Sequence, residues 1–193
     1  VVRGYNDGFA FCYKIPDGKG PCVNVQSELT AYNFAGDYTA WFYNGENHNI
    51  GPEKLTETDG TRLPVMTVKA GDKHYMAIHE ACLETGAPLV LQSKGGESLF
   101  SVASKPTSLS PGYTSAWRVV LYGTTPGVLT DSHLLELLNP DPDSRYDFSW
   151  VKPGLAVWDW RINGAVWDGF TYGMSYPSWV RMVDFAAEQG FKY

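Results

Sequence analysis

The stretch PVMTVKAGDKHYMAIHEA, residues 64–81, holds two runs of strand-forming residues on either side of a turn. Valine, isoleucine and tyrosine favour β-strands, and the small and polar residues Ala70-Gly71-Asp72 let the chain reverse between the runs. Runs of the same kind continue from Phe9 to about Gly123, at residues 9–14, 28–34, 39–44, 88–92, 98–104 and 116–123. No helical pattern interrupts them. Short strands at this spacing predict a mainly β fold, an antiparallel sandwich.

Further turn sequences separate these runs. They are Pro16-Asp17-Gly18, Asn44-Gly45, Asp59-Gly60 and Gly95-Gly96. After Gly123 the pattern changes, and Thr130 or Asp131 is expected to cap a helix over residues 132–138. A loop rich in Pro and Asp follows this helix, and we place a boundary in it, between about Asp141 and Lys152. The predicted domains are therefore residues 1–145 and 146–193.

The second domain has the order of a βα unit. Residues 155–160 predict a strand, residues 161–176 a long loop, and residues 177–189 a helix that Gly190 ends. The apolar residues on one face of that helix are Trp179, Val183 and Ala186. A new strand starts at residues 191–193, so we expect the chain to be a fragment of a longer protein.

Charge and length limit the partners and the size of the fold. The chain has 15 Lys and Arg residues against 21 Asp and Glu residues, a formal net charge of −6, and no basic run. Nucleic acid is therefore a poor partner, because phosphate binding needs a Lys- and Arg-rich face. No apolar run approaches the ~18–20 residues that span a bilayer. With 193 residues, the chain is also too short for a complete (β/α)₈ barrel of roughly 250 residues.

Cysteine and histidine give weak signals. A Cys12–Cys22 bridge and free thiols at Cys12, Cys22 and Cys82 both stay open, because the spacings match no zinc or CxxC pattern. We expect solvated or locally hydrogen-bonded side chains at His48, His74, His79 and His133, which have no mutual metal spacing. No serine-hydrolase, Walker A or dinucleotide motif occurs.

Several motifs in a fixed order resemble glycoside hydrolase family 97, the α-glucosidases and α-galactosidases of bacterial oligosaccharide use. The most specific are SWVKPG at 149–154 and WDW at 158–160. The resemblance also rests on Asn6–Phe11, Glu28-Leu29-Thr30, Ile78-His79-Glu80-Ala81, Trp117–Val120, Leu138-Asn139-Pro140 and Asp184–Gly190. It covers most of the chain. Ala116 stands where we expect proline before Trp117-Arg118, which weakens assignment to any one subgroup.

The resemblance implies three domains. They are a β-supersandwich of the galactose-mutarotase type, a catalytic (β/α)₈ TIM barrel and a small C-terminal β-domain. This chain would hold most of the supersandwich and the first βα unit of the barrel. The implied activity is exo-acting hydrolysis of α-glucosides or α-galactosides from oligosaccharides. The catalytic carboxylates would lie beyond Tyr193, so we name no catalytic residue here.

The resemblance also implies a cofactor. Members of the family that invert configuration bind Ca²⁺ in the active site, and the N-terminal domain supplies one carboxylate ligand. Related metal sites could serve retaining members as well, so calcium favours the inverting branch only slightly. Glu80 occupies the similar position, and calcium takes oxygen ligands such as carboxylates. Glu80 is therefore our candidate metal ligand. Read without the resemblance, it is a glutamate on the solvated face of a strand.

Substrate contacts are expected from Trp158, Trp160 and Asp159. Active-site residues of (β/α)₈ barrels follow the C-terminal ends of the strands, and aromatic faces stack on sugars. Alternation along a strand puts the two tryptophans on one side and Asp159 on the other. The alternative for these residues is a packing role.

Two other functions stay open. One is a non-catalytic carbohydrate-binding β-sandwich, and the other is a sandwich that serves only as a scaffold. A periplasmic or secreted bacterial location is implied by the resemblance alone. The sugar, the stereochemical outcome and the oligomeric state are not determined by the sequence.

Overall fold

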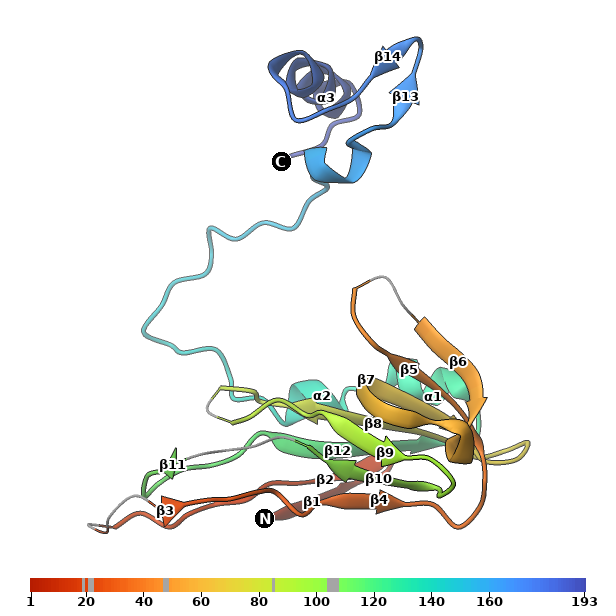
Figure 1. The fold of residues 1–193 in the computed structure, drawn as a ribbon. Helices are drawn as coiled ribbons and strands as arrows, with labels where there is room; N and C mark the ends of the chain where they lie inside the picture. The colour runs from red at the N-terminus through yellow and green to blue at the C-terminus, as the bar shows by residue number, and fades with distance from the viewer. Residues whose placement is uncertain (19, 21–22, 47–48, 85, 104–107) are drawn as a thin grey trace. The chain divides into compact units, whose positions relative to one another are not determined.

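The computed structural model describes residues 1–193 except 19, 21–22, 47–48, 85 and 104–107 (Figure 1). Cys22 and His48 lie outside the described residues. The chain forms two compact units, Val1–Asp141 and Pro142–Tyr193. The division between them falls between Asp141 and Pro142, at the start of the loop in which we placed the domain boundary.

Unit 1 consists of strands and short helices. The main strands are β1 (Val2–Tyr5), β2 (Gly8–Phe11), β4 (Ala31–Asn33), β5 (Thr39–Tyr43), β6 (Asn49–Lys54), β7 (Asp59–Lys69), β8 (Tyr75–Ala81), β9 (Leu91–Lys94), β10 (Leu99–Val102) and β12 (Trp117–Gly123). Two shorter strands, β3 (Val23–Asn24) and β11 (Ser108–Leu109), pair with each other. Each predicted run overlaps a strand, which confirms the mainly β fold, whereas β1, β3, β6 and β11 were not predicted.

The main sheet is one continuous antiparallel sheet of ten strands. Its order is β1-β2-β12-β8-β7-β9-β10-β4, and β5 joins β6 to β7. The long strand β7 explains the continuity, because residues 66–69 pair with β8 while residues 59–62 pair with β9. From the sequence we predicted an antiparallel sandwich and did not predict this connection through β7. The structure has a single curled sheet whose two parts share β7 (Figure 1).

The predicted turn at Asp59-Gly60 was also wrong, because these residues begin β7. They pair with Lys94 and Ser93 of β9. Gly60 has a φ of +87°, a conformation that glycine adopts without strain. The chain therefore bends at this point while its backbone stays in the sheet.

The main core lies inside the curl. Strand alternation and the register Met66↔Ile78 put these two side chains on one face, and both are buried. The other part of the sheet supplies Leu91 and Phe100, and the ring of Phe100 lies 5.6 Å from that of Phe42. One face of the curled sheet is therefore packed against itself.

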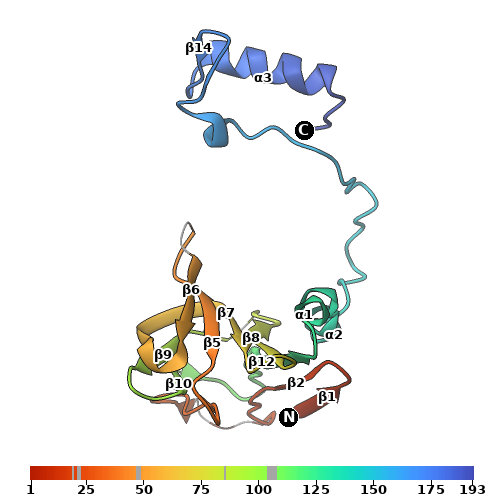
Figure 2. The same cartoon turned by 90° about the vertical axis from the view of Figure 1, so that its right-hand side faces the viewer.

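Two helices cover the opposite face of the sheet. They are α1 (Pro126–Asp131) and α2 (Leu134–Leu137), and they pack on β8 and β12 (Figure 2). Leu134 is buried with Val119. The predicted helix over residues 132–138 was too long, because Ser132 is extended and its hydroxyl accepts the Leu134 N–H at 3.2 Å. In the described part of the chain, no helix is long and apolar enough to cross a membrane.

Unit 2 lacks the predicted strand at residues 155–160. Residues 159–162 form a 3₁₀ turn, η2 (Asp159–Ile162). The backbone of residues 155–157 does lie beside Tyr193. The Tyr193 N–H donates to the Leu155 carbonyl at 3.2 Å, and the Val157 N–H donates to the Tyr193 carbonyl at 2.9 Å. These are the contacts of two parallel segments, but they are too few to form a regular strand.

The predicted loop at residues 161–176 contains a hairpin. Its strands are β13 (Val166–Trp167) and β14 (Phe170–Thr171). The turn Asp168-Gly169 has positive φ at both residues, as a two-residue hairpin turn requires. An Asp-Gly pair between apolar residues is a hairpin signal, so the sequence carried the information that we missed.

The helix predicted over residues 177–189 is confirmed as α3 (Tyr176–Glu188). Of the three residues predicted on its apolar face, Ala186 is buried, but the other two are not. Trp179 is 44% exposed and Val183 is 63% exposed. The buried residues of the helix are Ser178, Met182 and Ala186. The apolar periodicity predicted the helix. Which face of the helix is buried depends on where the hairpin and η2 pack against it.

Candidate functional site

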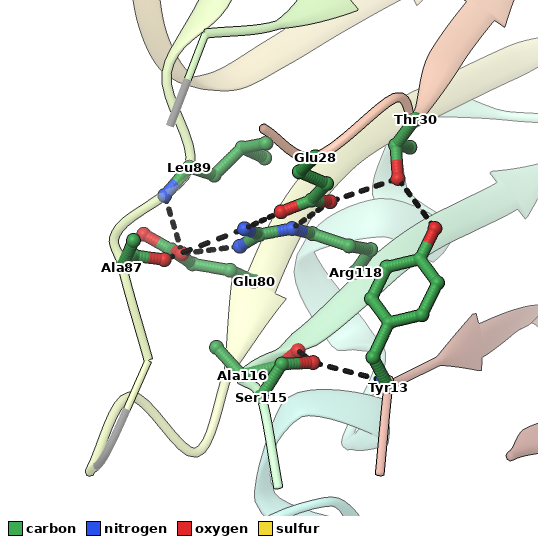
Figure 3. A network of polar contacts seen from close by, with 9 residues as sticks. All are labelled: Tyr13, Glu28, Thr30, Glu80, Ala87, Leu89, Ser115, Ala116 and Arg118. Carbon is green, nitrogen blue, oxygen red and sulfur yellow. Dashed lines mark hydrogen bonds and ion pairs between the residues drawn. The ribbon is translucent and has the colours of Figure 1, made fainter. Parts of the chain in front are cut away.

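A buried polar cluster lies at one end of β8 and β12 (Figure 3). Arg118 of β12 stands directly opposite Glu80 of β8 in the antiparallel register. Alternation puts both side chains on the face that also carries Ile78. Glu28 reaches Arg118 from the segment before β4, although it lies 90 residues away in the sequence. Three distant segments therefore meet at one guanidinium.

Arg118 holds Glu28 through two nearly parallel hydrogen bonds. Nε donates to Oε1 at 3.0 Å and Nη2 donates to Oε2 at 2.6 Å. This two-point contact is the strongest geometry for an arginine and a carboxylate. Nη2 also donates to the Ala87 carbonyl at 3.3 Å. The N–H donors of Nε and Nη2 are therefore all used by Glu28 and Ala87.

Glu80 is held by single contacts to one of its oxygens. Arg118 Nη1 donates to Oε2 at 3.2 Å, and the Leu89 N–H donates to the same oxygen at 2.7 Å. Both described contacts of the carboxylate are thus made through Oε2. The second oxygen, Oε1, takes part in neither.

The cluster is buried and carries an unbalanced charge. Side-chain exposure is 2% for Arg118, 7% for Glu28 and 12% for Glu80. Burial raises the pKa of Glu80, and the Leu89 N–H and the charge of Arg118 oppose that rise. Burial also disfavours the Arg118 cation, but the hydrogen bond and charge of Glu28 outweigh it and raise the pKa of Arg118. With both carboxylates ionised, two negative charges face one positive charge.

Hydroxyl groups extend the cluster. Thr30 donates to Glu28 Oε1 at 2.8 Å, and the Tyr13 hydroxyl lies 2.9 Å from the Thr30 hydroxyl. The buried Tyr32 hydroxyl has no hydrogen-bond partner among the described residues. Burial raises the pKa of Tyr32. Glu28 is therefore fixed by Thr30 as well as by Arg118.

A cavity of about 480 Å³ opens beside the cluster. Glu28 and Arg118 form part of its wall, with Lys14 as a further charged residue. The remaining wall is largely apolar and aromatic and includes Tyr13, Ile15, Val25, Leu109 and Tyr113. Glu80 is not among its lining residues. A largely apolar cavity with a few polar groups is typical of small-molecule sites.

The surroundings of Glu80 fit the predicted calcium ligand in one respect. Its carboxylate belongs to a buried cluster with excess negative charge, and such a cluster favours a bound cation. The described residues hold no group of three or more His, Cys, Asp or Glu side chains that could bind a metal. Calcium takes six to eight oxygen ligands. Glu80 would therefore contribute one ligand of a site that needs several more oxygen ligands.

In unit 2 the structure brings Trp158 and Trp160 together. Their ring centroids lie 5.9 Å apart, and the Arg161 guanidinium lies 5.1 Å from the ring of Trp158 and 5.8 Å from that of Trp160. Both rings are more than half exposed, at 59% and 52%. Large exposed aromatic faces of this kind suit stacking on a sugar.

Asp159 has a structural contact. Its Oδ2 accepts a hydrogen bond from Trp179 Nε1 at 2.9 Å, which ties η2 to α3. Trp158 lines a second cavity of about 400 Å³ with Trp167, Tyr172 and Arg181. Asp159 and Trp160 are not among the residues that line it. The three predicted substrate contacts therefore do not converge on this cavity.

The weak cysteine and histidine signals stay weak. Cys12 and Cys82 are free thiols. The His74 ring stacks on Tyr122 and makes a 2.7 Å hydrogen bond to its hydroxyl. Burial lowers the pKa of His79, whose buried Nδ1 has no hydrogen-bond partner among the described residues. The exposed His133 lies 3.6 Å from Glu136.

Sequence reasoning missed the part that Glu28 and Arg118 play in the cluster. Both stood inside quoted motifs, but neither was named as a candidate site residue. An arginine inside an apolar strand was the available signal, because a buried arginine needs a carboxylate partner. Which carboxylate it would meet could not be known from spacing.

Comparison with known proteins gives a family and a set of relatives. Residues 1–140 match the model described as glycosyl-hydrolase 97 N-terminal. The chain is 28% identical, over 99% of its length, to a retaining alpha-galactosidase of Bacteroides thetaiotaomicron. It is 29% identical, over its whole length, to a probable retaining alpha-galactosidase of Streptomyces bingchenggensis. The chain spans 35% and 30% of those two proteins.

Solved structures show the same similarity. A glycoside hydrolase family 97 enzyme from a Pseudoalteromonas species, in complex with acarbose, matches 97% of the chain with a TM-score of 0.78 and 26% identity. The chain covers 31% of that enzyme. A beta-arabinopyranosidase matches with the same TM-score at 17% identity, which is evidence for the fold alone. Because the family model matches well over half of the chain, the chain belongs to glycoside hydrolase family 97 and carries the N-terminal domain of that family.

Proposed function

We propose that this chain is part of an exo-acting α-glycosidase that releases sugars from α-galactosides or α-glucosides. The observation that carries the proposal is the match to retaining alpha-galactosidases over 99–100% of the chain. These relatives favour an α-galactoside substrate and retention of configuration. Retaining enzymes use a carboxylate nucleophile and an acid–base carboxylate. We place both on the part of the protein beyond Tyr193.

Unit 2 is proposed as the start of the catalytic barrel. In support of this, residues 155–157 lie parallel to Tyr193, and the helix α3 lies between these segments in the sequence. A strand, a helix and a parallel return strand form the repeating unit of such a barrel. Regular strand geometry would require a longer ladder of hydrogen bonds with a neighbouring strand.

The activity is tested with the complete protein that contains this chain. Purified protein is incubated with nitrophenyl α-galactoside and nitrophenyl α-glucoside, and the first anomer released is followed by NMR. We expect hydrolysis of the α-galactoside with retention. Binding of galactosides without any hydrolysis would instead favour the carbohydrate-binding module, and absence of both binding and hydrolysis would favour a scaffold.

Substrate contact is proposed for the aromatic pair Trp158 and Trp160. Replacing Trp158 by alanine removes one stacking face worth about 0.5–1.5 kcal/mol, which corresponds to a fall in kcat/KM of about 2- to 12-fold. Trp150→Ala is the matched control, because Trp150 is also exposed, at 75%, and lines neither described cavity. Equal kcat/KM values for the two variants would remove Trp158 from the substrate site.

Calcium is proposed as the cofactor, with Glu80 as one ligand. In support of this, Glu80 lies in the buried cluster with excess negative charge, and the bound ion would supply positive charge in the active site. Calcium titration of the chelator-treated complete protein should show binding that Glu80→Ala removes. Unchanged affinity in that variant would exclude Glu80.

A periplasmic or secreted location remains a prediction of the family resemblance. Cell fractionation of the source organism, with an antibody against this chain, tests it.

A further inference from the structure

The buried cluster contains an arginine whose hydrogen-bonding edges are divided unequally. Glu28 occupies Nε and Nη2 of Arg118 through two contacts, at 3.0 and 2.6 Å. Glu80 receives one contact, from Nη1 at 3.2 Å. A guanidinium has five N–H donors in a fixed fork, so a carboxylate that takes one edge leaves the other donors for a different partner. Nη2 also donates to the Ala87 carbonyl at 3.3 Å, so Glu28 and Ala87 together leave only Nη1 to Glu80.

This division determines how Glu80 is held. Its Oε2 is fixed from two directions, by Arg118 Nη1 and by the Leu89 N–H at 2.7 Å. Neither contact uses Oε1. A carboxylate that bound Arg118 through both oxygens would have a lone pair of each oxygen occupied and its charge more fully neutralised, so it would bind a cation more weakly.

We propose that Glu28 is a positioning residue for Glu80: by occupying one edge of Arg118, it keeps the Glu80 carboxylate available as a calcium ligand. The inference rests on the calcium role proposed above. Glu28 does not itself bind the ion. It acts through Arg118, in the way that outer residues orient metal ligands by hydrogen bonding.

The charges support the same role. Arg118 without Glu28 would have Glu80 as its only carboxylate partner, and its positive charge would neutralise the carboxylate proposed to bind the ion. Side-chain exposures of 2% and 7% for Arg118 and Glu28 show that solvent does not screen this pair. Glu28 therefore cancels the charge of Arg118 as well as occupying its donors. Thr30 holds Glu28 in place by donating to Oε1 at 2.8 Å.

The test is calcium titration by calorimetry on the complete, chelator-treated protein. Glu28→Gln keeps the size of the side chain and removes its charge. We expect the calcium Kd to rise by about 10- to 100-fold, the usual effect of losing an outer partner of a metal ligand. The matched control is Glu53→Gln. Glu53 also pairs with an arginine, Arg62 at 3.4 Å, and accepts a hydrogen bond from a threonine, Thr58 at 2.8 Å.

A second variant separates positioning from simple loss of stability. In Glu28→Gln combined with Arg118→Met, the competing guanidinium is gone, so calcium affinity should recover toward the wild-type value. The melting temperature without calcium reports whether each variant is folded. A mere structural role for Glu28 predicts no recovery, because the double variant loses still more contacts.

Each outcome decides the matter. A weaker Kd in Glu28→Gln, an unchanged Kd in Glu53→Gln and recovery in the double variant support the proposal. An unchanged Kd in Glu28→Gln, an equal loss in both single variants, or no recovery would overturn it while the calcium role of Glu80 stands. If Glu80→Ala binds calcium like the wild type, the calcium role of Glu80 fails, and the positioning role with it.

Discussion

Replacing Arg118 by methionine should destabilise unit 1 strongly. The substitution leaves Glu28 and Glu80 buried without a counter-ion, at 7% and 12% side-chain exposure. Breaking a buried ion pair by removing one partner costs about 3–5 kcal/mol, because the remaining charge is neither paired nor hydrated. The Arg62–Glu53 pair is longer and more exposed, at 14% and 22%, so Arg62→Met should cost only about 1 kcal/mol.

Native-state hydrogen exchange measures the loss of stability of unit 1 within the complete protein. The amides of β8 and β12 are buried in the sheet and report the free energy of opening of unit 1. A loss of about 3–5 kcal/mol makes their exchange faster by roughly two to three and a half orders of magnitude. Arg62→Met should accelerate it by less than about tenfold.

A triple variant tests whether the unpaired charges of Glu28 and Glu80 cause the loss of stability. Arg118→Met combined with Glu28→Gln and Glu80→Gln removes all three charges while it keeps similar side-chain volumes. This triple variant should exchange more slowly than Arg118→Met alone, because neutral amides cost less to bury than carboxylates. If Arg118→Met accelerates exchange by less than tenfold, or if the triple variant is less stable than the single one, the reasoning is refuted.

Two further substitutions test the packing of unit 1. Gly123→Ala would put a Cβ 2.5 Å from the Cβ of Val128, and crowding of this kind costs about 1–3 kcal/mol. We expect the melting temperature to fall by about 2–12 °C. An unchanged melting temperature would show that α1 can shift away. Phe100→Ala empties a fully buried position of the main core and should cost about 3–5 kcal/mol by hydrogen exchange. Leu29→Ala, at 88% exposure, should stay within about 0.5 kcal/mol, and similar losses for both would contradict the assigned core.

Local patterns in the sequence were sufficient for α3 and for the strands of unit 1 other than β1, β3, β6 and β11. Apolar and β-branched residues between turn sequences predicted the strands, because alternation and turn chemistry act over a few residues. The same reasoning failed at Asp59-Gly60, which belongs to β7. A glycine turn signal does not show whether a partner strand is present, and β9 supplies that partner.

Two failures in unit 2, the strand at residues 155–160 and the buried face of α3, have one physical cause. A strand at residues 155–160 needs hydrogen-bond partners on another segment along its length. Among the described residues, only 192–193 form backbone hydrogen bonds to it from another segment, and these reach only Leu155 and Val157. Without a full ladder, residues 159–162 form a 3₁₀ turn instead. The buried face of α3 depends in the same way on what packs against it. Helical periodicity alone does not choose between adjacent faces.

By itself, the sequence determined the mainly β character of unit 1, the helix α3 and the family resemblance. All of these follow from short-range patterns or short motifs. Only the tertiary structure decided that the strands form one curled sheet, and that Glu28 meets Arg118 across 90 residues of sequence. The reason is that pairing between distant segments depends on register and on chain reversal along the whole fold, which no local pattern records.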